Sequence, residues 1–287
     1  MKNNENTKGR VRLALARAGV YALLIFLTIL CLFSFYMLII NATRSNGELQ
    51  AGFTLFPSTH FVENFVNAWN DASINIPQGL LNSFFIAAST ALLTCYFSAL
   101  TAYGLHAYEF KLKNAAFIFI MAVMVIPKQV SAVGFVQLCM KLGLTNNFLP
   151  LILPTIAAPV VFFYLKQYME SVLPMEIVEA ARVDGSHEFR TFNAIILPML
   201  KPALAVQMIF SFVESWNNYF IPALLLDKAH MKTVPIMIAQ LRSADYSKFD
   251  MGKVYMFILL AILPVLLVYI FLSKSIIKGV TAGSVKG

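Results

Sequence analysis

Six long apolar segments constrain this chain more than any other feature of its sequence. Each is long enough for a helix that crosses a hydrocarbon layer of about 30 Å, which takes about 20 residues. The runs are continuous, whereas the strands of a membrane barrel alternate apolar and polar positions. The sequence therefore predicts an all-α, polytopic membrane protein, with six transmembrane helices at roughly 13–40, 80–105, 115–140, 148–167, 195–226 and 254–277.

Composition agrees with a chain that is surrounded mostly by lipid. Only 13% of the 287 residues are charged, against about 25% in soluble proteins. The first apolar segment exceeds the core of a signal peptide, which is about 7–15 residues, and no small-residue cleavage site follows it, so we expect a retained helix. The basic residues do not cluster with aromatic stacking platforms, so we expect no nucleic-acid partner.

Basic residues predict the orientation, because they favour the cytoplasmic side of short loops. They gather before the first apolar segment and after the last one, and Lys111 and Lys113 lie between the second and third. We therefore expect the cytoplasmic segments to be 1–12, 105–114, 168–194 and 279–287. The expected outer connections are 41–79, 141–147 and 227–252, and the last of these holds both signs of charge.

No motif for catalysis or metal binding is present in the sequence. The three cysteines have no metal or redox spacing and the four histidines are scattered. We find no GxSxG or HExxH pattern and no GxxxxGK[ST] phosphate loop. We therefore expect that the chain is not an enzyme, and that it holds no catalytic residue, cofactor or metal.

The polar stretch between the fourth and fifth apolar segments has a spaced pattern of residues. It begins with Glu179, Ala180 and Ala181, continues with Asp184 and Gly185, and after nine further residues reaches Ile195-x-Leu197-Pro198. The two alanines keep one face of the stretch thin, so that a partner surface can approach closely.

Local signals in this stretch predict two short helices joined at a bend. Pro174 suits the first turn of a helix, and Gly185 suits a helix end because glycine takes the left-handed conformation. Ser186 suits the cap of a second helix, with Glu188 in its first turn.

This pattern resembles, at every spacing, the EAA loop of ABC importer permeases (EAA, three residues, G, nine residues, I-x-LP). Over roughly 75–287 the chain resembles their carbohydrate-uptake branch, typified by the smaller permease of maltose importers. The further segments that carry the resemblance are Pro127-Lys128-Gln129, the loop at 142–147, Trp216-Asn217 and the tail at 279–287. The resemblance implies a permease core at 80–278 that includes a cytoplasmic coupling-helix (EAA) loop at 171–198.

The resemblance also implies partners and a mechanism. They are a second homologous permease, two cytoplasmic ATPase subunits that hold ATP and Mg, and an extracellular solute-binding protein that delivers a sugar. Transport would use alternating access across a bacterial plasma (inner) membrane, with both termini cytoplasmic. The tail would reach the ATPases, and the 227–252 loop would probe the binding protein. The residues implied in coupling to the ATPase are Glu179, Ala180, Ala181, Asp184 and Gly185.

The fifth apolar segment contains a polar face at helical spacing, formed by Gln207, Ser211, Glu214, Asn217 and Asn218. Polar groups in a membrane helix face a partner helix or a wet cavity. We interpret the first two as contacts between helices and favour a translocation path for the others. Trp216 could equally anchor at the membrane interface, and a kink at Pro127 could serve a gate or only packing. The candidate path residues are Glu214, Trp216, Asn217, Asn218, Tyr219 and Gln129.

Two other functions remain open at this point. A secondary transporter driven by an ion gradient usually shows more intramembrane carboxylates, internal repeats and more spans. An ABC importer for a solute other than a sugar, such as glycerol phosphate, is the second alternative.

Overall fold

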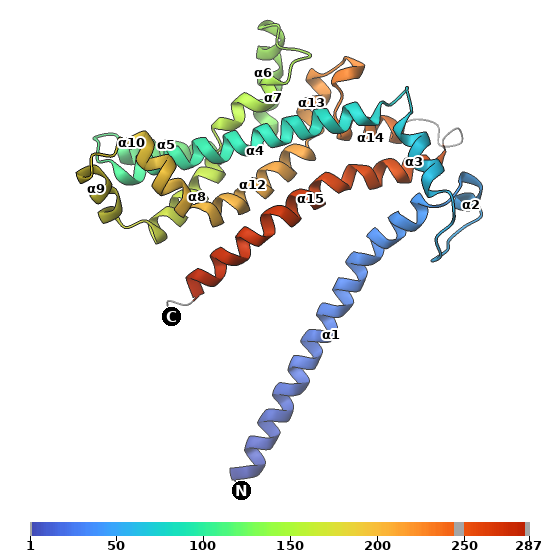
Figure 1. The fold of residues 1–287 in the computed structure, drawn as a ribbon, viewed down its shortest axis with the longest axis horizontal. Helices are drawn as coiled ribbons and strands as arrows, with labels where there is room; N and C mark the ends of the chain where they lie inside the picture. The colour runs from blue at the N-terminus through green and yellow to red at the C-terminus, as the bar shows by residue number, and fades with distance from the viewer. Residues whose placement is uncertain (1, 244–249, 285–287) are drawn as a thin grey trace. The chain divides into compact units, whose positions relative to one another are not determined.

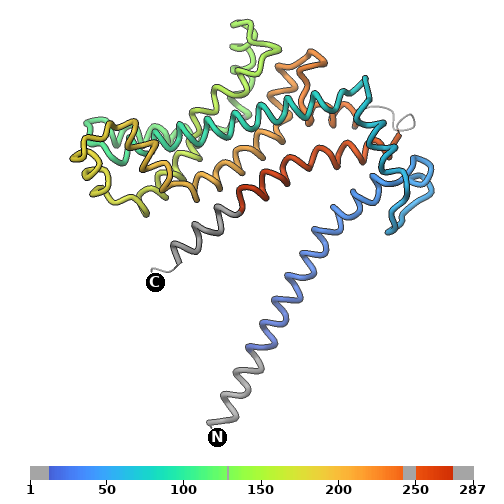
Figure 2. The backbone as a smooth tube through the Cα atoms, viewed as in Figure 1, coloured from blue at the N-terminus to red at the C-terminus, as the bar shows by residue number. Residues whose placement is uncertain are grey.

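The structure is a computed structural model. It describes the backbone of residues 2–243 and 250–284, and the side chains of residues 13–127, 129–241 and 250–273 (Figure 2). The regular structure of these residues is all helical, which confirms the predicted class. The expected tail at 279–287 lies outside the described side chains, so its role stays a prediction.

The chain divides into two compact units, each described by itself. The first, Met1–Asn70 with Asp245–Leu260, contains α1 (Lys2–Ala42), α2 (Asn46–Gln50), α3 (Phe61–Trp69) and the start of α15 (Met251–Ser284). The second, Asp71–Ala244 with Ala261–Gly287, contains α4 (Ile76–Ala107), α5 (Lys113–Met124), α6 (Lys128–Lys141), α7 (Leu149–Ile152), η1 (Leu153–Ile156), α8 (Pro159–Val172), α9 (Met175–Val183), α10 (Glu188–Thr191), η2 (Phe192–Ile196), α11 (Leu197–Met199), α12 (Lys201–Trp216), α13 (Phe220–Leu225), η3 (Ala229–Met231) and α14 (Val234–Ser243) (Figure 1).

Four helical stretches within the described residues are long and apolar enough to cross a membrane. They are Leu13–Ala42, Ile76–Ala107, Leu149–Val172 and Met251–Ser273. Each coincides with one of the predicted apolar segments. Two further stretches qualify only if a sharply bent pair of helices is counted as one span.

The predicted third segment is one of these bent pairs. Helices α5 and α6 meet at an angle of 96°, and Pro127 immediately precedes α6 in an extended conformation, with φ −61° and ψ 126°. Proline lacks the N–H that a continuous helix needs, and it also disfavours helical geometry at the residue before it. The predicted interruption at Pro127 is therefore confirmed.

The predicted fifth segment, 195–226, is not one continuous helix, which corrects the sequence-based expectation. It comprises a π-helical turn (η2), α11, α12 and α13, and the chain bends by 82° between Met199 and Lys201. Pro198 and Pro202 flank that bend and remove backbone donors there. A second break, at 217–219, separates α12 from α13.

Helix α4 is the central element of the second unit and packs along α12 and α8 (Figure 1). Small side chains on its buried face permit close approach of the neighbouring helices, and they include Ala87, Ala91, Cys95, Ala99 and Ala102. With 32 residues, α4 is about 48 Å long at 1.5 Å per residue. Its two ends can therefore lie on opposite sides of a bilayer.

The two ends of α4 hold two different loops. Near its start, the Asn82 amide donates to the carbonyls of His230 (2.9 Å) and Lys232 (3.0 Å), and the Ser83 hydroxyl accepts from the Val234 N–H at 2.8 Å. Near its other end, the Tyr103 hydroxyl donates to Glu188. The loop before α14 and the loop around α9 thus lie at opposite ends of α4 (Figure 1).

Candidate functional site

Helix α9 ends at a glycine, as the sequence predicts. Gly185 has φ +73°, its N–H donates to the Arg182 carbonyl at 3.0 Å, and the Ser186 N–H donates to the Ala181 carbonyl at 2.9 Å. This pair of bonds is a Schellman motif, which needs a left-handed residue at the position of Gly185. An added Cβ there would meet no atom within 4 Å, so the glycine is required by its backbone angle and not by crowding within this chain.

The second short helix, α10, begins differently from the prediction. Its cap is His187, which makes no side-chain cap bond, and the Ser186 hydroxyl accepts instead from the Thr191 hydroxyl at 2.9 Å. The Ser186 N–H is used in the turn that ends α9. The extended residue that caps α10 is therefore the next one, His187. Glu188 does lie in the first turn of α10, as predicted.

The residues implied in coupling divide between two faces of this loop. Glu179, Ala180, Asp184 and Gly185 are exposed, whereas Ala181 is 5% exposed. Ala181 therefore packs inward, beside the fully buried Val178, and the predicted thin outer face is correct for Ala180 only. Val178 joins a core formed with α4, α8 and η2, which includes Tyr103, Leu165, Phe192 and Ile196.

Two large apolar side chains also lie on the outside of the loop. Val183 is 87% exposed and Phe189 is 70% exposed. Exposed apolar side chains beside charged ones are typical of a surface that another protein covers. Neither residue was predicted as part of the site.

A polar cluster fixes the loop to the end of α4. The Arg182 Nε donates to Glu188 Oε1 at 2.8 Å, and the Tyr103 hydroxyl donates to Glu188 Oε2 at 2.9 Å. The Arg182 guanidinium also lies over the ring of Tyr108, 5.2 Å from its centre, and donates to the Ala107 carbonyl at 3.4 Å. These contacts join α9, α10 and α4 at one point.

The electrostatics of this cluster agree with its geometry. The hydroxyl of Tyr108 and then the guanidinium of Arg182 hold the pKa of Glu188 below its ordinary value. The hydrogen bond to Glu188 raises the pKa of Arg182. The pair is thus a stable ion pair at neutral pH. Arg182 and Glu188 carry opposite charges on either side of the predicted bend, and this could have suggested the ion pair. No local signal points to Tyr103, which is 85 positions away from Glu188.

The polar face predicted on the fifth segment is divided in the structure. Gln207 and Ser211 are 7% and 6% exposed, which agrees with contacts between helices. Glu214 is exposed near the end of α12, and Asn217, Asn218 and Tyr219 are exposed at the break before α13. Gln129, in the first turn of α6, is exposed as well.

Trp216 does not lie with these exposed residues. It is 3% exposed, and its ring stacks on Phe212 with 5.7 Å between centres and 18° between planes. The apolar face that could have received a sugar is therefore covered by another side chain. This corrects the prediction that Trp216 lines a path.

Among the described residues, no three His, Cys, Asp or Glu side chains come together in a way that could hold a metal ion.

Comparisons with known proteins agree on one kind of relative. Residues 96–276 match a family described as the binding-protein-dependent transport system inner membrane component. The chain is 32% identical over 277 residues to the arabinooligosaccharides transport system permease protein AraQ of Bacillus subtilis, covering 94% of this chain and 96% of that protein. It is 31% identical to the melibiose/raffinose/stachyose import permease protein MelC of the same bacterium, covering 88% and 91%.

A solved structure has the same fold. It is the crystal structure of a bacterial ABC transporter involved in the import of the acidic polysaccharide alginate. The matched chain has a TM-score of 0.76 and 20% sequence identity, with 90% of this chain and 96% of that one covered.

Proposed function

The chain belongs to the family of binding-protein-dependent transport system inner membrane components, and on that premise we propose that it is the permease subunit of an ATP-driven importer for a sugar or an oligosaccharide. The named substrates of its relatives, arabinooligosaccharides for one and melibiose, raffinose and stachyose for another, support the substrate class. The partners are a second homologous permease, two cytoplasmic ATPase subunits and an extracellular solute-binding protein.

One observation carries the coupling role. The outer face of the α9 loop is exposed, while its inner face is buried against the end of α4. A partner that binds Glu179, Ala180, Asp184 and Gly185 would therefore push on a loop that is firmly joined to a helix about 48 Å long. The exposed Val183 and Phe189 add apolar contact area to the same surface.

The topology in this proposal has six spans in the plasma (inner) membrane and cytoplasmic termini, with each bent pair of helices counted as one span. The α9 loop is then cytoplasmic, and the segment before α14 faces the binding protein. The separation of these two loops along α4 supports this arrangement.

The proposed translocation path uses the exposed polar residues near the break between α12 and α13. Glu214, Asn217, Asn218 and Tyr219 offer a carboxylate, two amides and an aromatic ring, which are groups that suit the hydroxyls and apolar faces of a sugar. Gln129 follows the break in the third segment. Both breaks interrupt the regular helix, and non-helical backbone is tolerated at membrane depth where it lines a protein-enclosed or water-filled space.

The mechanism is alternating access. ATP binding closes the two ATPases and moves the docked α9 loops, and these loops shift α4 with its packed helices. ATP binding and hydrolysis supply the energy, and it reaches the permease pair because the ATPases bind its two states with different affinity.

Co-purification tests this function. The chain would be tagged, extracted gently from native membranes, and identified together with whatever accompanies it. We expect an ATPase, a second permease and a binding protein, and the ligand of that binding protein names the solute. A chain that purifies alone and transports without ATP after reconstitution would establish a gradient-driven carrier. A non-sugar ligand would keep the importer and change the substrate.

A further inference from the structure

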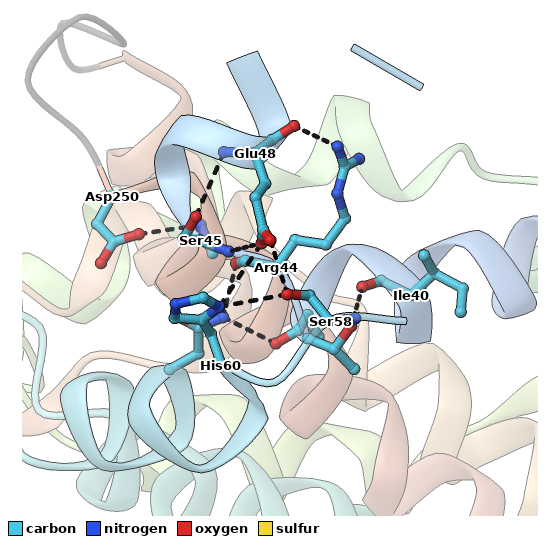
Figure 3. A network of polar contacts seen from close by, with 11 residues as sticks. Ile40, Arg44, Ser45, Glu48, Ser58, His60 and Asp250 are labelled. Atoms are coloured by element: carbon cyan, nitrogen blue, oxygen red, sulfur yellow. Dashed lines mark hydrogen bonds and ion pairs between the residues drawn. The ribbon is translucent and has the colours of Figure 1, made fainter. Parts of the chain in front are cut away.

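The first unit contains a buried cation just beyond the apolar stretch of α1. Arg44 is 6% exposed and follows the end of α1 by two residues. Its Nη2 donates to the carbonyl of Glu48 (Figure 3). Nη2 also donates to the carbonyl of Gly52 at 2.7 Å, and Nη1 reaches Asn41 Oδ1 at 3.5 Å. Carbonyl oxygens satisfy N–H groups but leave the positive charge uncompensated.

The neighbouring carboxylate is engaged elsewhere. Glu48 accepts from the Ser45 N–H at 2.9 Å and from the Ser58 hydroxyl at 2.8 Å, and it lies 3.6 Å from His60 Nδ1 (Figure 3). Within the part of the chain that the structure describes, Arg44 forms no ion pair. A buried charge without a counter-charge is costly, so an anion supplied from outside the chain would stabilise this site.

A cavity of about 280 Å³ opens beside the guanidinium. Apolar side chains form much of its wall, with a few polar groups among them. The residues that line it are Met37, Asn41, Arg44, Leu49, Gln50, Gly52, Phe53, Met251 and Tyr255.

The place of this cavity along the chain points to the depth of lipid headgroups. Met37 and Asn41 belong to the last turns of the apolar stretch Leu13–Ala42, and Met251 and Tyr255 begin the apolar stretch Met251–Ser273. Cationic and aromatic residues at the ends of spans are typically found at the membrane–water interface.

We propose that this cavity binds the phosphate group of an anionic phospholipid. The two Nη2 hydrogens are held by the Glu48 and Gly52 carbonyls, so the guanidinium would use its remaining Nη1 or Nε donor, with its full positive charge, to bind a phosphate oxygen. The apolar wall can cover the glycerol and the first part of an acyl chain. Free inorganic phosphate shares the charge chemistry, but it would leave the apolar wall unused.

Native mass spectrometry of the purified full-length chain with its partners tests the proposal. The delipidated protein is titrated with phosphatidylglycerol, with phosphatidylcholine of the same acyl chains, and with inorganic phosphate. We expect phosphatidylglycerol to bind the most tightly. Arg44→Gln should weaken its binding about tenfold, which is the effect of losing one hydrogen bond between charged groups. Lys228→Gln removes an exposed cation outside the cavity and should change nothing.

A second variant separates binding from folding, because Arg44 also holds the backbone of residues 48–52. Met37→Trp fills the apolar part of the cavity and leaves the guanidinium in place, so it should weaken phosphatidylglycerol binding without affecting inorganic phosphate. Equal binding of the two lipids, or unchanged binding in both variants, would overturn the proposal. Displacement of the lipid by low concentrations of inorganic phosphate would overturn the lipid assignment in favour of a free-phosphate site. Neither arm measures transport, so the result is independent of the proposed import function.

Discussion

Gly185 shows how much of the α9 loop depends on a single residue. Its φ of +73° is open to glycine, while other residues lose about 1–2 kcal/mol in the left-handed region. The sequence could predict this position, because a glycine after a run of helix formers is a local signal. It could not predict that Ser186 belongs to the end of α9 and is not the cap of α10. That assignment depends on which N–H groups form the Schellman hydrogen bonds, and one of them is the N–H of Ser186.

Substituting Gly185→Asp should impair ATPase docking and coupling while membrane insertion remains intact. The new side chain strains the turn and adds a charge to the exposed face. The measurement is the amount of co-purifying ATPase and the ATP hydrolysis that the loaded binding protein stimulates. Gly143→Asp is the matched control, because Gly143 has φ +68° and equally open surroundings in a different loop. Normal sugar uptake in the Gly185 variant would count against the coupling role.

Glu214→Ala should change uptake kinetics without changing assembly. A carboxylate that hydrogen-bonds a sugar hydroxyl contributes about 1.5–3 kcal/mol, so we expect about a tenfold or larger loss of uptake efficiency. Uptake is measured in cells against sugar concentration, and Glu63→Ala removes an exposed carboxylate from α3 as a control. Unchanged kinetics would assign Glu214 to helix packing.

Glu48 gives the first unit a dependence on pH. Hydrogen bonds from the Ser45 backbone N–H and the Ser58 hydroxyl hold its pKa below the ordinary value of 4.5. A lowered pKa in the folded state means that ionised Glu48 stabilises the fold above pH 4.5 and that this contribution disappears as the pH falls through the folded-state pKa. We expect the melting temperature of Glu48→Gln to fall less between pH 6 and pH 3 than that of the unaltered chain, with Glu63→Gln as control. If the melting temperatures of Glu48→Gln and of the unaltered chain fell equally with pH, Glu48 would not be the group that makes the stability depend on pH.

At the scale of helices, the predicted apolar segments were mostly correct and their breaks were only partly foreseen. Pro127 marks the break in the third segment by a local rule. The break at 217–219 was missed, because its polar residues also fit a continuous helical face. The chain that follows α13 is held by a residue far away in the sequence. The Asn146 side-chain oxygen accepts from the N–H groups of Asp227 and Lys228 at 2.8 and 2.9 Å. No pattern within the fifth segment reports a contact made about 80 residues away.

The Arg182–Glu188 pair should matter more for coupling than for stability. The two side chains are 36% and 41% exposed, and pairs of this kind add only about 0.2–1 kcal/mol to the free energy of unfolding. We expect Arg182→Gln and Glu188→Gln each to lower the sugar transported per ATP hydrolysed, with melting temperatures nearly unchanged. The double variant should be no worse than either single one, because both remove the same contact. Additive losses would contradict a shared positioning role.

At the scale of the whole molecule, composition and the apolar segments were enough to predict a helical membrane protein, and the spaced loop pattern was enough to predict its family. The distribution of site residues between surface and core was not predictable, since the spacing pattern does not show that Ala181 and Trp216 are 5% and 3% exposed. The two loops held at the ends of α4 also make the expected orientation testable. Because α4 is about 48 Å long, labels placed on the two loops should report opposite sides of the membrane.

Val183→Cys and Lys228→Cys provide these labels, since both positions are exposed in the structure. They are introduced after Cys31, Cys95 and Cys139 have been replaced by serine or alanine. With a membrane-impermeant maleimide on intact cells or spheroplasts, we expect Lys228→Cys to react at once and Val183→Cys to react only after the membrane is opened. The cysteine-free chain gives the background signal, and co-purification of the partner permease shows that each variant is still assembled. Labelling of Val183→Cys from outside would invert the topology and remove the α9 loop from the reach of a cytoplasmic ATPase. Labelling of both positions from one side would mean that α4 does not cross the bilayer, and the proposed transmission of movement along this helix would fail with it.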